Sequence, residues 1–205
     1  MIDTLRHSLA RAARAEDVLR AHDAGDFPGG SGFGLLTLHR PSNVDDARVL
    51  RRLLETVAEL SQRLPVIFPM HPRTRQRIAD AEMTHVLDRS GVLSLPPLGY
   101  LDLLGLMRDA RLVLTDSGGL QEETTALGVP CLTLRTNTER PVTIEEGTNT
   151  LVGADPARIR AAVSDVLRTG GKRGRVPELW DGEAARRIVD VLIGWAGGAR
   201  QALTA

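Results

Sequence analysis

Residues 111–134, RLVLTDSGGLQEETTALGVPCLTL, decide the fold expected for this chain. Residues 112–114 form a short apolar run that is typical of a strand buried on both faces. A helical stretch follows and ends at Gly128, after which residues 129–130 lead into a second apolar run. The stretch is therefore predicted to form a strand, a sharp turn, a helix and a second strand.

The turn between the first strand and the helix has the composition of an anion-binding site. Thr115, Asp116 and Ser117 are expected to supply capping oxygens. Gly118 and Gly119 let the backbone approach a ligand closely. The N–H groups of a helix N-terminus point outward and its dipole favours negative charge, so a phosphate or diphosphate is one interpretation. An ordinary capped turn is the alternative.

The composition limits the classes of protein to which the chain can belong. It has 205 residues, which fits one large domain or one and a half, and 42% of them are hydrophobic. Lys plus Arg and Asp plus Glu both number 26, so the formal net charge is zero. This balance removes the electrostatic argument for a nucleic-acid or acidic-membrane partner, and neither is expected.

The location is predicted from the single cysteine and from the lack of long apolar runs. Cys131 lies in an apolar run and is expected to be a core residue, with neither a disulfide nor a metal cluster available to it. No run approaches the roughly 20 apolar residues of a membrane span, and the first residues do not resemble a signal peptide. A cytoplasmic protein is the expectation, with no metal and no cofactor.

Short apolar runs alternate with amphipathic stretches along the rest of the chain. Strands are expected at 33–40, 66–71, 92–100, 112–114, 131–134 and 150–152. Besides the helix that Gly128 ends, helices are expected at 2–24, 45–64, 71–83, 101–110, 155–167 and 182–195, and loops at 25–32, 41–46 and 135–149. This alternation predicts an α/β fold, a Rossmann-like parallel sheet in three layers with helices on both faces.

Ligands of such sheets bind at the carboxyl ends of the strands. The unusual polar residues of this chain fall directly after the predicted strands, and they are His39, Arg40, His71, Ser117, Gly118, Gly119 and Arg135. Each histidine alone has an ordinary structural interpretation. Their convergence on one edge of the sheet favours the phosphate interpretation of the turn.

Four segments carry a resemblance to a known family: TLHRPSNVDD (37–46), MHPRTR (70–75), the long run from LGYLDLL to TERP (98–141) and EEGTNTLVG (145–153). With them the chain resembles the C-terminal half of the non-hydrolysing UDP-N-acetylglucosamine 2-epimerases, which have a two-domain GT-B-like fold. The resemblance implies that residues 1–24 are a hinge helix left from the interdomain connection. It also implies that residues 25–205, with the C-terminal helix, form the UDP-binding Rossmann-like domain, and that the N-terminal acid/base domain is absent.

The resemblance also assigns roles to individual residues. It places the UDP diphosphate on Ser117, Gly118 and Gly119, and the ribose hydroxyls on Glu123. The uracil pocket would include Leu103, where some members of the family stack an aromatic ring on the base, and Arg135 belongs to the same UDP site. His39 would be the catalytic residue near the diphosphate. Residues of the sugar side or of a second, regulatory ligand site would be Arg40, His71, Thr138, Glu139 and Arg140.

The family reaction interconverts UDP-GlcNAc and UDP-ManNAc by elimination and re-addition of UDP, and serves cell-envelope polysaccharide synthesis. Its acid/base carboxylates come from the other domain, so the chain alone is expected to bind UDP weakly and to be inactive. A stand-alone UDP-sugar-binding module and the donor domain of a GT-B glycosyltransferase are the alternatives. The inner faces of the helix over 2–24 and of the last helix are expected to be apolar and exposed where another domain would pack. Self-association through this surface, as a homodimer, would then be a consequence of the absent domain.

Overall fold

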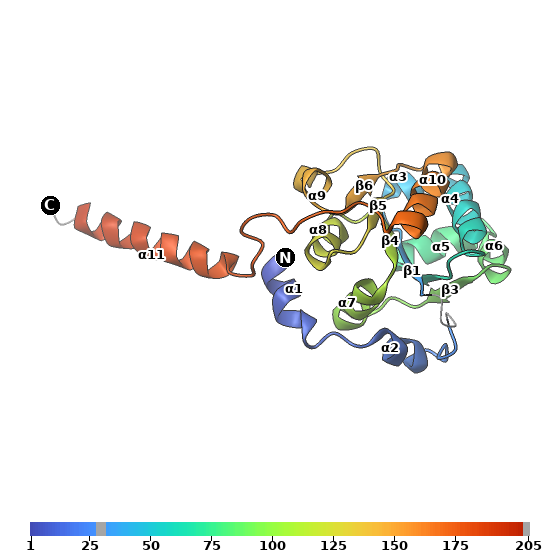
Figure 1. Cartoon of the computed structure of the whole chain (residues 1–205), viewed down its shortest axis with the longest axis horizontal. Coiled ribbons are helices and arrows are strands. Elements are labelled where there is room, and N and C mark those ends of the chain that lie inside the picture. Colours follow the sequence, from blue (N-terminus) through green and yellow to red (C-terminus); the bar gives the residue numbers. More distant parts are fainter. Residues whose placement is uncertain (28–31, 203–205) are drawn as a thin grey trace.

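Six parallel strands form the central sheet in the computed structural model, which describes residues 1–27 and 32–202 (Figure 1). The strand order is β3-β2-β1-β4-β5-β6, so the chain moves outward from β1 in one direction and then returns through β4 to the other edge. The strands are β1 (Gly34–Thr37), β2 (Val66–Pro69), β3 (Val92–Leu95), β4 (Leu112–Thr115), β5 (Cys131–Thr133) and β6 (Asn149–Leu151). The predicted α/β Rossmann-like fold is confirmed.

Helices connect the strands and flank the sheet. They are α1 (Ile2–Leu9), α2 (Ala15–Ala21), α3 (Pro41–Val44), α4 (Ala47–Leu60), α5 (Pro72–Asp80), α6 (Thr84–Asp88), α7 (Tyr100–Asp109), α8 (Gly118–Leu127), α9 (Pro141–Glu145), α10 (Pro156–Thr169) and α11 (Ala184–Ala202). Residues 28–31 of the expected 25–32 loop and residues 203–205 lie outside the described part of the chain.

The sheet is buried on both faces, because neighbouring residues of each strand point to opposite sides. Leu36 of β1 packs into a core with α4, α5, α6 and α10. Leu35, the residue before it, packs into a second core with α1, α2 and α7. Both leucines are fully buried. The three predicted layers are confirmed, and continuous apolar runs in the strands are the sequence pattern that this burial requires.

The helix predicted over 2–24 is wrong as a single element, because it is divided into α1 and α2. The residues at the break are good helix formers, so local propensity does not cause it. Contacts with α7 do: the backbone N–H of Ala13 donates to the carbonyl oxygen of Leu101 at 3.3 Å. The carboxylate of Asp109 accepts the N–H of Ala15 at 3.2 Å. The chain turns to follow α7, and the role of residues 1–24 as a hinge stays a prediction.

Two segments expected to be loops contain short helices. Residues 41–46 contain α3, and residues 135–149 contain α9. Pro41 and Pro141 each occupy the first helical position, where the missing N–H of proline has no consequence and its fixed φ favours the helix. The sequence analysis missed this signal because both segments are polar.

Several boundaries also differ from the prediction. The helix expected over 71–83 ends at Asp80, and α6 follows it, because Glu82 between them adopts the left-handed conformation with φ of 54°. The last helix continues beyond the expected end at residue 195. The strands have three or four residues. Strands β1, β2, β3 and β5 are shorter than expected, β4 extends one residue further to Thr115, and β6 has the expected length but begins one residue earlier. Only those residues pair with a neighbouring strand.

Helix α11 extends away from the layers (Figure 1). Its N-terminal turn is held by Asp3 of α1, whose carboxylate accepts the N–H of Ala185 at 2.8 Å. The expected exposed apolar face is confirmed on this helix, with Ile188, Val189, Val191, Leu192, Ile193 and Trp195. It is wrong for α1 and α2, whose apolar side chains belong to the second core. None of the described helices is both long enough and apolar enough to cross a membrane.

The close approach of the 10–14 turn to α7 gives a stability prediction. A Cβ atom added at Gly105 would overlap the backbone carbonyl oxygen of Ala13. Gly105→Ala is expected to lower the free energy of unfolding by about 1–3 kcal/mol, because the α1–α2 turn must move away from α7. Urea denaturation measures this difference.

The matched control is Gly194→Ala in α11, where an added Cβ atom meets open space. There, alanine changes only helix propensity, and the stability should stay equal or rise by at most about 1 kcal/mol. Equal denaturation midpoints for the wild type and Gly105→Ala would show that the turn adapts freely.

Candidate functional site at the carboxyl edge of the sheet

The turn from β4 to α8 leaves the N-terminus of α8 without a side-chain cap. Ser117 is the N-cap residue, and its hydroxyl makes no capping hydrogen bond. Its N–H donates to the hydroxyl of Thr115 at 3.0 Å. The Thr115 hydroxyl also lies 2.6 Å from that of Thr37 on β1. The prediction that residues 115–117 cap the helix is therefore wrong, and the first N–H groups of α8 face outward.

Asp116 makes its hydrogen bonds across the sheet edge instead. Its carboxylate is fully buried. It accepts the backbone N–H groups of His39 and Arg40 at 3.1 and 2.9 Å. It also accepts the side-chain amide of Asn43 at 3.1 Å, and that amide donates to the carbonyl oxygen of Leu134 at 2.9 Å. One carboxylate and one amide thus hold the ends of β1, β4 and β5 together.

The ring of His39 is a further donor to Asp116, with Nδ1 2.8 Å from Oδ1. Burial alone would raise the pKa of Asp116. The hydrogen bonds from the His39 ring and from the backbone N–H groups of Arg40 and His39 outweigh burial, and the net pKa lies below its ordinary value of 3.8. Asp116 is therefore ionised at neutral pH.

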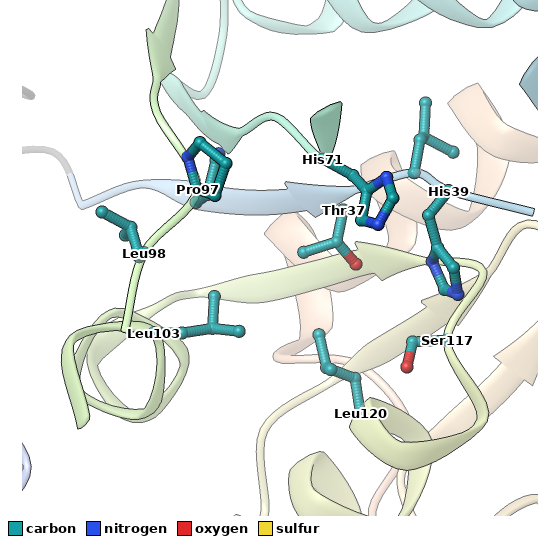
Figure 2. Close-up of a pocket in the computed structure, with 10 residues that line it drawn as sticks. Thr37, His39, His71, Pro97, Leu98, Leu103, Ser117 and Leu120 are labelled. Atoms are coloured by element: carbon teal, nitrogen blue, oxygen red, sulfur yellow. The ribbon is translucent and has the colours of Figure 1, made fainter. Parts of the chain in front are cut away.

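A mostly apolar pocket of about 260 Å³ opens beside the turn. Figure 2 shows four predicted site residues around it, which come from different elements: His39, His71, Leu103 and Ser117. The ring centroids of His39 and His71 are 5.9 Å apart. The remaining walls are Thr37, Leu38, Pro69, Pro97, Leu98 and Leu120. The pocket has the size and apolar character to take a flat ring, with polar groups at one side.

Glu123 lies in the second turn of α8 and is 6% exposed. The hydroxyl of Tyr100 donates to its Oε1 at 2.9 Å. Burial raises the pKa of Glu123, the Tyr100 hydrogen bond lowers it, and the net pKa lies above the ordinary value of 4.5. Glu123 also borders a second hollow of about 340 Å³ together with Tyr100 and Gly119. This buried carboxylate is only partly satisfied by the described residues.

Two arginines, Arg40 and Arg135, lie near the N-terminus of α8 and differ in their hydrogen-bond partners. A Cβ atom added at Gly118 would lie 4.0 Å from Nη2 of Arg40 and 3.9 Å from Oε2 of Glu139. Arg40 Nε is buried and has no hydrogen-bond partner among the described residues. Arg135 instead donates to both oxygens of Glu139 at 2.9 and 2.8 Å, which lowers the pKa of Glu139 to about 2. Among the described residues Arg135 pairs with Glu139 and Arg140 with Glu122, whereas the Nη2 group of Arg40 lies beside Gly118.

The segment before α9 is fixed to α8 by polar contacts. The hydroxyl of Thr138 donates to Gln121 Oε1 at 2.5 Å, and the amide of Asn149 donates to the same oxygen at 3.1 Å. Arg140 pairs with Glu122 at 2.7 Å. These contacts bring the predicted residues 138–140 beside the first turns of α8. Their assignment to the sugar side of a ligand stays a prediction, as does the regulatory role of Arg40 and His71.

Some of the side chains that shape the site were not anticipated. The sequence analysis missed Asn43, Tyr100 and Gln121, although Tyr100 lies within the segment assigned to the base. Cys131 is buried and its thiol pKa is raised to about 11 by that burial, which confirms a core residue. Within residues 1–27 and 32–202, no cluster of three or more His, Cys, Asp or Glu side chains could hold a metal ion.

Comparison with known proteins identifies the family. A family model described as UDP-N-acetylglucosamine 2-epimerase matches residues 1–193. The chain belongs to the UDP-N-acetylglucosamine 2-epimerase family. The UDP-N-acetylglucosamine 2-epimerase of Methanococcus maripaludis is 39% identical over 165 residues, 79% of this chain and 44% of the relative.

Two further relatives are informative. The UDP-2,3-diacetamido-2,3-dideoxy-D-glucuronate 2-epimerase of Pseudomonas aeruginosa is 41% identical over 167 residues, 78% of this chain and 44% of that protein. The structure of the Methanocaldococcus jannaschii UDP-GlcNAc 2-epimerase in complex with UDP-GlcNAc and UDP matches with a TM-score of 0.78 and 35% identity, covering 93% of this chain and 52% of that one. The solved neighbours confirm the GT-B-like resemblance. The chain spans about half the length of the curated relatives that it matches.

The raised pKa of Glu123 predicts a pH-dependent effect of Glu123→Gln. Glutamine can still accept the Tyr100 hydrogen bond, but it removes a carboxylate whose ionisation opposes folding. Below the ordinary pKa of 4.5 the carboxyl is neutral in both states, and the two proteins should have similar stability. Above the raised pKa the wild type should become the less stable of the two. Urea denaturation at about pH 4 and about pH 7.5 measures the free energy of unfolding of the wild type and of the variant.

The control for this effect is Glu122→Gln at the neighbouring position. That variant loses the ion pair with Arg140 and has no buried charge to relieve. It should therefore show no gain in stability at neutral pH. A Glu123→Gln protein that is less stable than the wild type at neutral pH would contradict the account of Glu123 as an unsatisfied carboxylate.

Proposed function

We propose that this chain is the UDP-binding half of a UDP-N-acetylglucosamine 2-epimerase. The observation that carries the proposal is the uncapped N-terminus of α8 with the guanidinium of Arg40 beside Gly118. The N–H groups at a helix N-terminus, the positive end of the helix dipole and the Nη2 group of Arg40 beside Gly118 provide what a diphosphate requires.

The remaining parts of UDP are matched to the hollows on either side of this turn. The ribose hydroxyls are assigned to Glu123, because hydroxyl donors would complete the hydrogen bonding of its buried carboxylate. Uracil is assigned to the apolar pocket, against Leu98 and Leu103. A leucine at position 103 gives van der Waals contact without ring stacking, so the base contributes less to affinity than it would on an aromatic side chain.

The proposed reaction inverts C2 of the sugar and interconverts UDP-GlcNAc and UDP-ManNAc. A base removes the C2 proton, the C2–H electron pair forms the C1=C2 double bond of a glycal, and the electron pair of the C1–O bond goes to the β-phosphate oxygen. UDP then re-adds at C1 while C2 is protonated on the opposite face. His39, Arg40 and the α8 N-terminus are positioned beside the proposed diphosphate site, where they would stabilise the negative charge that develops on the leaving oxygen. The reaction also needs an acid/base domain that corresponds to the other half of the relatives.

The relatives share the nucleotide in their names but differ in the sugar. Two of them carry names with different sugars, N-acetylglucosamine and a diacetamido-glucuronate, while both names contain UDP and a 2-epimerase activity. Both match this half of the protein with similar identity. We infer that this half recognises UDP, the part of the substrate that both names share. The proposal includes a cytoplasmic location and a use of the product in cell-envelope polysaccharides.

The phosphate site predicts the effect of Gly118→Ala. The added methyl group has ordinary contact distances of 3.9 and 4.0 Å in the free protein, so the fold should not change. It occupies the approach to the α8 N-terminus, and UDP affinity is expected to fall at least about tenfold, equivalent to ~1.4 kcal/mol. Calorimetric titration with UDP measures this, with Gly194→Ala as the distant control. Unchanged affinity would remove the diphosphate from this turn.

The epimerase activity is tested by supplying the other half. The chain is mixed with a separately produced polypeptide that corresponds to the uncovered part of the Methanocaldococcus jannaschii relative, and is incubated with UDP-GlcNAc in D₂O. The expected result is UDP-ManNAc with deuterium at C2, formed only by the mixture. UDP binding without turnover would instead favour a stand-alone binding module. Sugar transfer to an acceptor without C2 inversion would favour a glycosyltransferase.

A further inference from the structure

We propose that Asp116 is the positioning residue of His39, and that it fixes the histidine with its proton on Nδ1 so that Nε2 alone faces the ligand. The inference rests on the proposed function for its role in turnover, but its geometry stands on the structure alone. The inference starts from one contact: the fully buried carboxylate of Asp116 lies 2.8 Å from Nδ1 of His39, which lines the pocket.

The direction of this hydrogen bond follows from the other partners of Asp116. The backbone N–H groups of His39 and Arg40 and the side-chain amide of Asn43 all donate to its oxygens. A carboxylate surrounded by donors is an acceptor only, so the nitrogen that meets it must carry hydrogen. In neutral imidazole the second nitrogen is then an acceptor. In a neutral His39 ring, Nε2 is therefore the nitrogen without hydrogen.

The exposure of the two groups fits this arrangement. The side chain of His39 is 38% exposed, whereas that of Asp116 has no exposed area. Because Nδ1 faces the buried carboxylate, Nε2 across the ring is left for the pocket, where Figure 2 shows His39 close to Ser117. When Nε2 takes up a proton, the carboxylate faces the resulting positive charge at hydrogen-bond distance. The ring can then offer Nε2–H to the oxygen that gains the electron pair when the C1–O bond breaks.

His71 provides an internal reference in the same pocket. It is the N-cap residue of α5, and its Nδ1 accepts the backbone N–H of Arg73 at 3.2 Å. In neutral form its proton must therefore be on Nε2, the opposite arrangement to that of His39. Two histidines with ring centroids 5.9 Å apart thus present opposite tautomers, and only that of His39 depends on Asp116.

The test is the tautomer of both histidines, measured by long-range ¹H–¹⁵N correlation NMR on the wild type and Asp116→Asn. Single histidine-to-asparagine variants assign the signals. The wild type should show Nδ1–H for His39 and Nε2–H for His71. In Asp116→Asn the new amide can donate to Nδ1, so His39 should change to Nε2–H while His71 stays the same. An Nε2–H tautomer of His39 in the wild type, or no change in the variant, would overturn the proposal.

Asn43→Ala is the matched variant, because it removes one donor to the same carboxylate and leaves the His39 contact in place. His39 should keep Nδ1–H there. If Asp116→Asn does not fold, the wild-type and Asn43→Ala tautomers decide the question. A merely structural role of Asp116 would not link its identity to the proton position on His39.

Turnover of the reconstituted enzyme separates this inference from the proposed function. Asp116→Asn should reduce turnover by at least about a hundredfold, the usual scale of a positioned acid–base group. UDP affinity should change by less than about tenfold, because the groups of the β4–α8 turn that are proposed to bind the diphosphate remain in the variant. Absence of UDP binding in the wild type would contradict the proposed function and leave the tautomer result standing. Full turnover in Asp116→Asn would overturn the positioning role.

Discussion

The hydrogen bonding of the Asp116 carboxylate is the constraint on which the site depends. A buried charge is strongly unfavourable unless donors surround it, and no residue adjacent to Asp116 in the sequence supplies those donors. They come from residues 39–43, more than 70 positions earlier in the chain. The turn after β1 can therefore take only the conformation that points these donors at β4. Asn43 extends the constraint to β5 through the carbonyl oxygen of Leu134.

This arrangement has a consequence for α8. Because the oxygens of Asp116 are used across the sheet edge, they do not cap the helix that begins two residues later, and its N-terminus stays open to a ligand. Glu123 shows the opposite situation. Its buried carboxylate has a raised pKa because burial outweighs the Tyr100 hydrogen bond. The carboxylate of Asp116 is surrounded by donors and organises the turn, whereas ionisation of Glu123 opposes folding.

The described residues form two hydrophobic cores, one on each face of the sheet. Helices cover both faces of the sheet and form two separate cores, so the carboxyl edge is held rigidly without further chain. The exposed apolar face of α11 contributes to neither core. The site is therefore built on rigid elements, and what the proposed reaction still needs is a second set of acid/base groups.

The amino-acid sequence by itself determined the parallel sheet, the strand–turn–helix motif at residues 111–128 and the family. The periodicity of apolar residues, the positions of glycines and the spacing of motifs are local properties that can be read along the chain. Only the tertiary structure decided the break between α1 and α2, the direction of the Asp116 hydrogen bonds and the pairing of Arg135 with Glu139. The first two depend on contacts between residues far apart in the chain, where donors and acceptors are matched by the fold. Local propensity favoured one long helix and a capped turn, and long-range hydrogen bonds replaced both.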